Sequence, residues 1–273
     1  MELIVQAGSD WLKLLPEALE RVSQELDRSG LWDMDEVQLE MSPQPDLVTL
    51  RLRRHVCGQL RGTPHLGDLC NFLLQSWKEC GYLGYSLEHL HAALNDLDRP
   101  QLVHLVRKRV DPMILWQTVR GLIQECVPIC DLETILETVL ENYAITQNPE
   151  SLGEFARQAL SRLFVPSLMQ NGELPVIVLA PEWQREMELS TTGRYLTLPA
   201  ASGSNLLRSL RKSLQSFSGS EPVLLCCGQI RPALRKLVAR MLPHVRVISY
   251  AELPPRTTVR RVATVSQSVG LSQ

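Results

Sequence analysis

The chain has 273 residues, of which 44% are hydrophobic and 21% charged, and its formal net charge is −2. This composition is typical of folded globular domains and excludes a largely disordered chain. The sequence has no apolar run of the roughly 20 residues that a membrane span needs. Its start, MELIVQAGSDW, lacks the basic flank and long apolar stretch of a secretory signal, so we expect none.

Residues 1–82 are expected to form a small α/β unit. Met1–Ala7 alternates weakly between apolar and polar residues, as a short strand does. A helix should follow and run to about Ser29, because Ser9 or Asp10 can accept the first free backbone N–H groups. Leucines and a valine recur on one face of this segment with helical spacing.

Two alternating segments come next, DEVQLEM and DLVTLRLRRHV, separated by the turn-prone SPQP. Period-two alternation on both sides of a turn predicts a hairpin with one buried face. The spacing of apolar residues then becomes helical from Leu66 to about Trp77.

Residues 83–168 are expected to form an all-helical middle unit. Its helices should begin at Ser86, Pro100, Asp111-Pro112 and Asp131, and a last one should span NPESLGEFARQALSRLF. Pro in the first helical turn and Asp or Ser just before it are ordinary start signals. Short helices joined by short links predict a compact bundle.

Residues 174–262 are expected to form a C-terminal α/β unit with mostly parallel strands, and residues 263–273 a frayed tail. LPVIVLA is a nearly unbroken apolar strand, as a sheet buried on both faces requires. A helix over Ser202–Ser216 precedes a strand, turn, helix and strand between Glu221 and Pro255. The fold class is therefore α+β with several subdomains.

No motif in the sequence predicts catalysis. Cys226-Cys227-Gly228 sits at a strand–helix turn, but a phosphate loop needs several glycines and an early Lys, and Lys236 comes two turns later. The histidines have no metal-ligand spacing, and His89 and His91 diverge on a helix. We therefore nominate no catalytic, cofactor-binding or metal-binding residue and expect no enzyme. The seven cysteines are expected to be reduced and mostly buried.

Charge is divided unevenly along the chain. Residues 205–273 carry eleven Lys and Arg against two Asp and Glu, a net +9, which leaves −11 for residues 1–204. One reading is a candidate protein-contact stripe on the basic helix, and its members are Arg231, Arg235, Lys236 and Arg240. The rivals are nucleic-acid binding by the basic unit, two solvated faces without a partner, and a degenerate nucleotide-binding enzyme using Gly228.

Two long blocks resemble a known family. VPICDLETILETVLENYA (Val127–Ala144) is similar to the hallmark VPIRDLxTILExLxxYA of the cytoplasmic domain of the type III secretion and flagellar export-gate proteins, the FlhA/SctV family. Cys130 stands where an Arg is usual. Residues Ile230–Leu253 resemble the family's IRPxLRxLxxxxxPxxxVLSYxEI, and LVHLVRKRVDPMILWQTVRGL looks like the segment before the first block.

The resemblance implies a non-enzymatic docking platform without cofactors in type III protein export. In the family this domain forms a ring of copies, typically nine, at the cytoplasmic face of the bacterial inner membrane. It lies below the membrane gate, receives export substrates and works beside the export ATPase. The membrane is reached through an N-terminal transmembrane region that is absent here, and no nucleic acid is bound. The all-helical third and α/β fourth subdomains would be about Leu83–Leu168 and Pro175–Val262.

One departure from the family affects its partners. The family usually inserts a small subdomain between the hairpin and the next helix, and that insert is tied to chaperone docking. Here only QLRGTPHL fills the gap. We therefore expect the N-terminal and helical units to pack directly on each other. We also expect weak or no binding of export chaperones.

Overall fold

The computed structural model of the chain describes residues 3–30, 37–52, 55–192, 195–215, 217 and 221–267. Parts of the predicted elements at 1–2, 35–36, 53–54 and 216, and most of the predicted tail, lie outside these ranges. The chain divides into two compact units, Met1–Leu160 and Ser161–Gln273. Each contains helices and a sheet, as the predicted mixed fold class requires. The predicted boundaries at 82/83 and 168/174 stay predictions.

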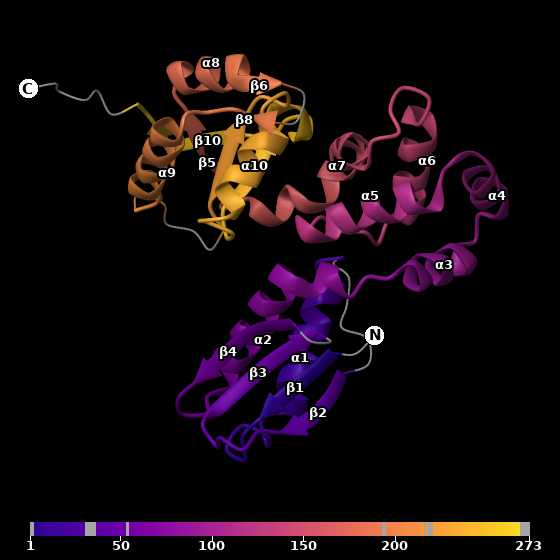
Figure 1. The fold of residues 1–273 in the computed structure, drawn as a ribbon, viewed down its shortest axis with the longest axis vertical. Helices are drawn as coiled ribbons and strands as arrows, with labels where there is room; N and C mark the ends of the chain where they lie inside the picture. Colours follow the sequence, from indigo (N-terminus) through magenta and orange to yellow (C-terminus); the bar gives the residue numbers. More distant parts are fainter. Residues whose placement is uncertain are drawn as a thin grey trace, which may run out of the picture. The chain divides into compact units, whose positions relative to one another are not determined.

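A four-stranded sheet in the order β2-β1-β3-β4 begins the first unit (Figure 1). Its strands are β1 (Leu3–Ala7), β2 (Val37–Met41), β3 (Leu47–Leu52) and β4 (His55–Arg61). β1 pairs in parallel with β2 and antiparallel with β3, while β3 and β4 form the antiparallel hairpin.

The predicted hairpin between the second and third strands is therefore wrong. β1 lies between them because its residues are far more apolar. Val5 of β1 and Leu50 of β3 are fully buried and suit the centre of the sheet, whereas four of the five residues of β2 are exposed and suit an edge. Alternation identified β1, β2 and β3 but not β4, because the predicted segment 46–56 covers β3 and only the first residues of β4. It also carried no information about which strands pair.

Helix α1 (Leu15–Arg28) covers one face of this sheet. It starts later than predicted, because the residues around Ser9 and Asp10 form turns and Leu14 is the N-cap. Trp11 is buried in that turn region, and the proline in the first turn of the helix fits its fixed φ.

Helix α2 (Leu66–Cys80) covers the same face and confirms the predicted helix from Leu66. Only residues 62–65 separate it from the end of β4, so no further subdomain lies between the sheet and this helix. The 3₁₀ turn η1 (Gly81–Leu83) then leads away from α2.

The rest of the first unit is helical and matches the predicted start signals. Its helices are α3 (Leu87–Asp96), α4 (Pro100–Arg109), α5 (Pro112–Gln124), α6 (Leu132–Asn142) and α7 (Pro149–Phe164), whose last turn belongs to the second unit. Ser86, Asp111 and Asp131 cap α3, α5 and α6 through their side-chain oxygens. These caps confirm the helix starts that the sequence predicts.

The turn between α5 and α6, residues 125–131, is held by side chains as well as by its backbone. Nη1 of Arg157 in α7 lies 3.1 Å from Oε2 of Glu125, and both side chains are largely buried. Cys126 has a positive φ of 52°, which reverses the chain direction. Asp131 then starts α6 by accepting hydrogen bonds from the backbone N–H and the hydroxyl of Thr134.

The same turn joins the helices to the sheet and its covering helices. Sγ of Cys126 donates to the carbonyl oxygen of Lys78 in α2, and the Ile129 N–H donates to the carbonyl oxygen of Gly30. Gly30 has a φ of 62°, and a β-carbon there would lie 2.6 Å from Sγ of Cys130. The sheet layer and the helices therefore pack directly, as expected from the short link.

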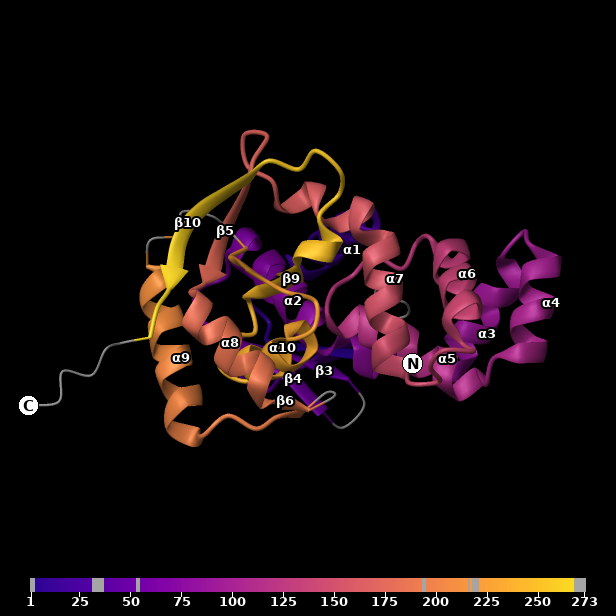
Figure 2. The ribbon, with the colours of Figure 1, turned by 90° about the horizontal axis from the view of Figure 1, so that it is seen from above.

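The second unit contains a parallel sheet in the order β10-β5-β8-β9. Its strands are β5 (Leu174–Leu179), β8 (Val223–Cys226), β9 (Arg246–Ser249) and β10 (Val259–Val265). Figure 2 shows β10 running beside β5. All three pairings are parallel, which confirms the predicted strand direction. Neighbouring residues such as Val176 and Ile177 are both fully buried, so the sheet is covered on both faces.

Three helices pack on one face of this sheet, and they are α8 (Pro181–Ser190), α9 (Ala200–Leu214) and α10 (Arg231–Ala239). The sequence did not predict α8, although Trp183 and Met187 are buried one helical turn apart. A short hairpin, β6 (Thr191–Thr192) and β7 (Tyr195–Leu196), follows it. The predicted tail starts too early, because Ala263 and Val265 belong to β10, where they pair with β5.

Replacing Gly8 by Ala should destabilise the first unit by about 1–3 kcal/mol, because the added carbon would overlap the carbonyl oxygens of Pro45 and Gln44. Gly121→Ala in α5 is the matched control. Its added carbon meets no atom within 4 Å, and Ala favours a helix interior by about 0.5–1 kcal/mol over Gly. Urea unfolding followed by circular dichroism measures both changes. Equal midpoints for the two variants would contradict the tight approach at Gly8.

Candidate interaction surfaces

The turn after β8 holds its cysteines by packing and hydrogen bonds. Cys226 is buried, and its Sγ donates to the carbonyl oxygen of Ile248 at 3.8 Å. Sγ of Cys227 lies 3.4 Å from Oε1 of Glu188. Burial raises the pKa of this thiol most, and the contact with Glu188 also raises it. A β-carbon on Gly228 would meet only the Ser249 β-carbon, at 4.0 Å. No neighbouring protein atom therefore requires glycine at position 228.

The predicted basic stripe on α10 is only partly at the surface. Arg231 is 1% exposed, and its Nη1 donates to the carbonyl oxygen of Val247 in β9 at 3.4 Å. Its place in an exposed stripe was therefore a wrong prediction. The cause is its position at the start of the helix, where the side chain points back over the sheet edge. Arg235 is half-buried and donates to the carbonyl oxygen of Val245 at 2.8 Å.

Lys236 and Arg240 are the exposed basic residues of the predicted stripe. Elsewhere in the basic segment, Nε of Arg246 lies 3.2 Å from Oε2 of Glu221. Nε of Arg260 lies 3.2 Å from Oε2 of Glu173. Several positive charges of this segment thus have partners within the unit.

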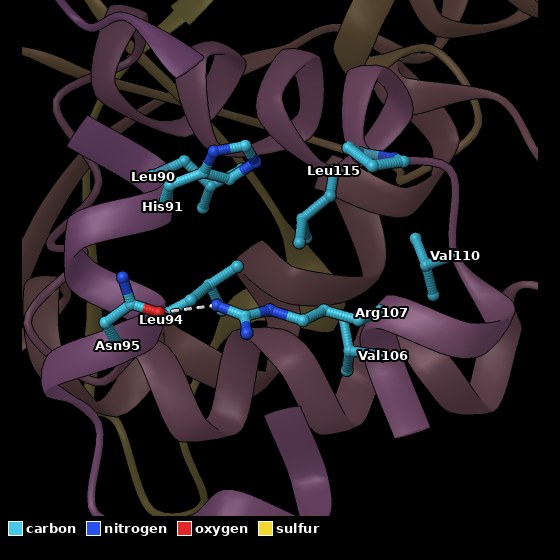
Figure 3. Close-up of a pocket in the computed structure, with 9 residues that line it drawn as sticks. Leu90, His91, Leu94, Asn95, Val106, Arg107, Val110 and Leu115 are labelled. Atoms are coloured by element: carbon cyan, nitrogen blue, oxygen red, sulfur yellow. Dashed lines mark hydrogen bonds between the residues drawn. The ribbon is translucent and has the colours of Figure 1, made fainter. Parts of the chain in front are cut away.

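A cavity of about 260 Å³ opens between α3, α4 and α5 in the first unit (Figure 3). Five apolar side chains form most of its wall, and they are Leu90, Leu94, Val106, Val110 and Leu115. Figure 3 shows them around the cavity: Leu90 and Leu94 lie on α3, Val106 on α4 and Leu115 on α5, and Val110 lies in the link between α4 and α5. The cavity has the size and lining to hold an apolar side chain.

Polar groups border this cavity on one side. Arg107 extends from α4, and its Nη2 donates to Oδ1 of Asn95 on α3 at 2.7 Å (Figure 3). His91 lies at the edge formed by α3. Lys108 and Arg109 continue the basic end of α4. An apolar side chain flanked by an acidic residue would therefore suit the cavity and its rim.

The sequence contained no sign of this cavity, because its apolar residues have ordinary core spacing in each helix. A cavity depends on the angles between helices, which periodicity does not report. The divergence of His89 and His91 was predicted. His89 faces Ser86, where its Nδ1 accepts the Ser86 N–H at 3.0 Å, while His91 lines the cavity.

The described residues do not form a metal site, and the cysteines are not paired in disulfides. Over the described residues, no group of three His, Cys, Asp or Glu side chains could hold a metal ion. None of the helices in those ranges is long and apolar enough to cross a membrane. All seven cysteines are free thiols, but the prediction that most are buried was wrong. Cys226 is buried, Cys130 is exposed and the other five are half-buried.

Residues 85–258, well over half of the chain, match the model of the FHIPEP family. The flagellar biosynthesis protein FlhA of Salmonella typhimurium is 32% identical over 154 residues, which cover 55% of this chain and 22% of FlhA. The harpin secretion protein HrpI of Erwinia amylovora is 24% identical over 192 residues, covering 68% of this chain and 27% of HrpI. The chain thus spans about a quarter of the length of these relatives.

Solved structures share the fold over nearly the whole chain. The Shigella flexneri MxiA protein aligns with a TM-score of 0.84 at 16% identity, covering 97% of this chain and 98% of MxiA. The Chlamydia pneumoniae CdsV protein, solved in complex with CdsO, gives 0.82 at 18% identity, with 97% of each chain covered. The nonameric SctV-C of EPEC gives 0.79 at 15% identity, with 97% and 98% covered.

Replacing Arg231 by Ala should destabilise the second unit by roughly 2–3 kcal/mol, because a buried guanidinium bond to the β9 backbone is lost. Arg240→Ala, at an exposed position of the same helix, should cost less than about 1 kcal/mol. Urea unfolding gives the size of each effect, and hydrogen exchange of α10 and β9 peptides assigns it to this unit. Equal losses from both substitutions would contradict a structural role for Arg231.

Proposed function

The chain belongs to the FHIPEP family, and from this membership we propose that it is a non-enzymatic docking component of a type III protein export apparatus. The observation that carries the proposal is the family match over residues 85–258. These residues include α3 to α10, and therefore both the cavity and the exposed end of the basic helix. The site of action would be the cytoplasmic face of the inner membrane, below an export gate.

We propose that copies of the chain associate with one another in a ring. EPEC SctV-C is described as nonameric, and CdsV was solved in complex with CdsO; both share this fold. Those assemblies belong to those proteins, but they support self-association and contact with another export component here. The head-to-tail contact of a ring joins two different surfaces of each copy.

The charge division of the chain suits a contact of this kind. Lys236 and Arg240 are exposed on α10, near the C-terminal end of the helix. Glu137 and Glu141 are exposed one turn apart on α6. We propose that the basic pair of one copy faces this acidic pair of its neighbour. Each exposed ion pair is worth only about 0–1 kcal/mol, so the contact must be collective and sensitive to salt.

We further propose that a neighbouring copy covers the cavity between α3, α4 and α5. The basic rim of the cavity, which includes Arg107, complements the net charge of −11 that residues 1–204 of the neighbouring copy carry. A buried apolar side chain at a contact adds more free energy than the surrounding ion pairs. Chaperone docking of the family's kind is not part of the proposal, since only residues 62–65 separate β4 from α2.

Reversing Lys236 and Arg240 to Glu should weaken self-association several-fold at low salt, because like charges would then face each other. Reversing Glu137 and Glu141 to Lys should do the same. Combining the four changes should restore part of the loss if the two pairs meet. Sedimentation velocity and mass photometry at low and high salt measure the assembly. A species of 30.8 kDa at every concentration and salt would contradict self-association.

Replacing His91 by Trp should also weaken self-association several-fold, because the indole can lie over the cavity and exclude a partner's side chain. His91→Ala is the matched control. It removes the same imidazole but leaves the cavity open, so it should assemble normally. Since His91 is exposed, circular dichroism spectra of both variants should match the unaltered chain. Equal assembly by the Trp and Ala variants would show that the cavity is not covered.

A further inference from the structure

A bulge in β4 gives Cys57 an unusual position in the sheet. Leu50 of β3 is paired with Gly58, and the next residue, Arg51, is paired with Val56. Cys57 is therefore the extra residue of the bulge, with no partner in the ladder. It packs against the core between the sheet and its covering helices, the side on which Gly58 also lies.

Helix α2 passes directly over this bulge. A β-carbon on Gly58 would lie 2.5 Å from Oγ of Ser76 in α2, which leaves no room for a side chain between strand and helix. β4 leads back into α2 through residues 62–65, so the two run in opposite directions. Cys57, the residue before Gly58, thus lies beside the helical turn that follows Ser76, and that turn ends in Cys80.

The two thiols meet at this point. The side chains of Cys57 and Cys80 are hydrogen-bonded to each other, and both residues are half-buried. Sγ of Cys57 also lies 4.0 Å from the carbonyl oxygen of His55 in its own strand. Other cysteines have different partners: Cys126 donates to the backbone of α2, and Cys227 contacts Glu188. A strand bulge and a helix end therefore bring together two cysteines that are 23 positions apart in the sequence.

The hydrogen bond makes the two thiols chemically unequal. It lowers the pKa of Cys80 below that of an ordinary thiol, although burial and the charge of Glu79 act in the other direction. The same bond, together with burial, raises the pKa of Cys57. Cys80 is therefore the thiol that more readily becomes a thiolate, the form that attacks an oxidant. Cys57 remains protonated beside it.

We propose that Cys57 and Cys80 form an oxidation site for hydrogen peroxide, which closes to an intramolecular disulfide between β4 and the end of α2. In the first step the Cys80 thiolate attacks one peroxide oxygen and the O–O bond breaks. Hydroxide departs, and a sulfenic acid remains on Cys80. In the second step the Cys57 sulfur attacks the Cys80 sulfur. The S–O bond breaks, and the displaced hydroxide combines with the Cys57 proton as water. Two electrons pass from the thiols to the peroxide, and its two oxygens leave as water.

This site is independent of the proposed export function, since it depends only on β4 and α2. The disulfide would fix the last residue of α2 to the sheet, directly before η1 and the helical part of the unit. The exposed thiol of Cys130 lies on the turn between α5 and α6 and serves as the reference for unassisted oxidation.

The test uses the full chain, reduced and then exposed to hydrogen peroxide at a few molar equivalents, alkylated, and digested with trypsin without reduction. The expected product is a cross-link between peptides 55–61 and 79–107, each with one cysteine, in a chain lighter by about 2 Da. Cys57→Ser should stop at a sulfenic acid on Cys80 that dimedone traps. Cys130→Ser should form the cross-link at the normal rate.

Two results would overturn the proposal. One is the absence of the 55–61 to 79–107 cross-link in a chain whose circular dichroism spectrum is native, at a peroxide dose that oxidises Cys130. The other is a cross-link of Cys80 to Cys70 or Cys126 in preference to Cys57, which would place the reactive pair elsewhere. The first measurement needs no substitution, so a variant that fails to fold cannot obscure it.

Discussion

The ion pair between Arg157 and Glu125 is the contact on which the rest of the first unit depends. It holds α7 against the turn between α5 and α6, with the guanidinium 3.1 Å from the carboxylate and largely out of water. Removing one partner of a buried pair costs about 3–5 kcal/mol, a large part of the net stability of a domain. The turn so held also binds α2 through Cys126 and the loop at Gly30 through Ile129. The sheet layer and the helices thus meet at this turn.

This turn bears directly on the proposed docking role of the chain. Docking needs surfaces that keep their shape, and the cavity exists only while α3, α4 and α5 keep their angles. The turn at residues 125–131 fixes the end of α5, and Asp111 fixes its start. In the second unit the parallel sheet fixes the position of α10, because Arg231 and Arg235 donate hydrogen bonds to β9 and to the loop before it. Two arginines of the predicted contact stripe, Arg231 and Arg235, therefore hold α10 in place, and Lys236 and Arg240 remain exposed on the same helix.

The sequence predicted most elements, because helix caps and apolar periodicity act over a few residues. Ser86, Asp111 and Asp131 each start a helix as expected. Pairing between strands is a property of the whole sheet, so the place of β1 between β2 and β3 could not be read from alternation. The same limit hid the cavity and the contact of Cys57 with Cys80, which join residues from different elements. Burial of Arg231 was missed because helical spacing says which residues share a face but not what covers that face.

The central claim is that this fold carries out a step of type III protein export, and secretion by living cells tests it most directly. Arg157→Ala in the genomic copy breaks the pair that holds the first unit, whereas Lys13→Ala changes an exposed charge in the turns before α1 and should leave the fold intact. The measurement is the amount of type III substrates in the medium, with the level of the chain followed by immunoblot. The account predicts that export falls with the folded chain in the Arg157 strain and stays normal in the Lys13 strain. Full export from cells that have lost the folded chain would contradict it.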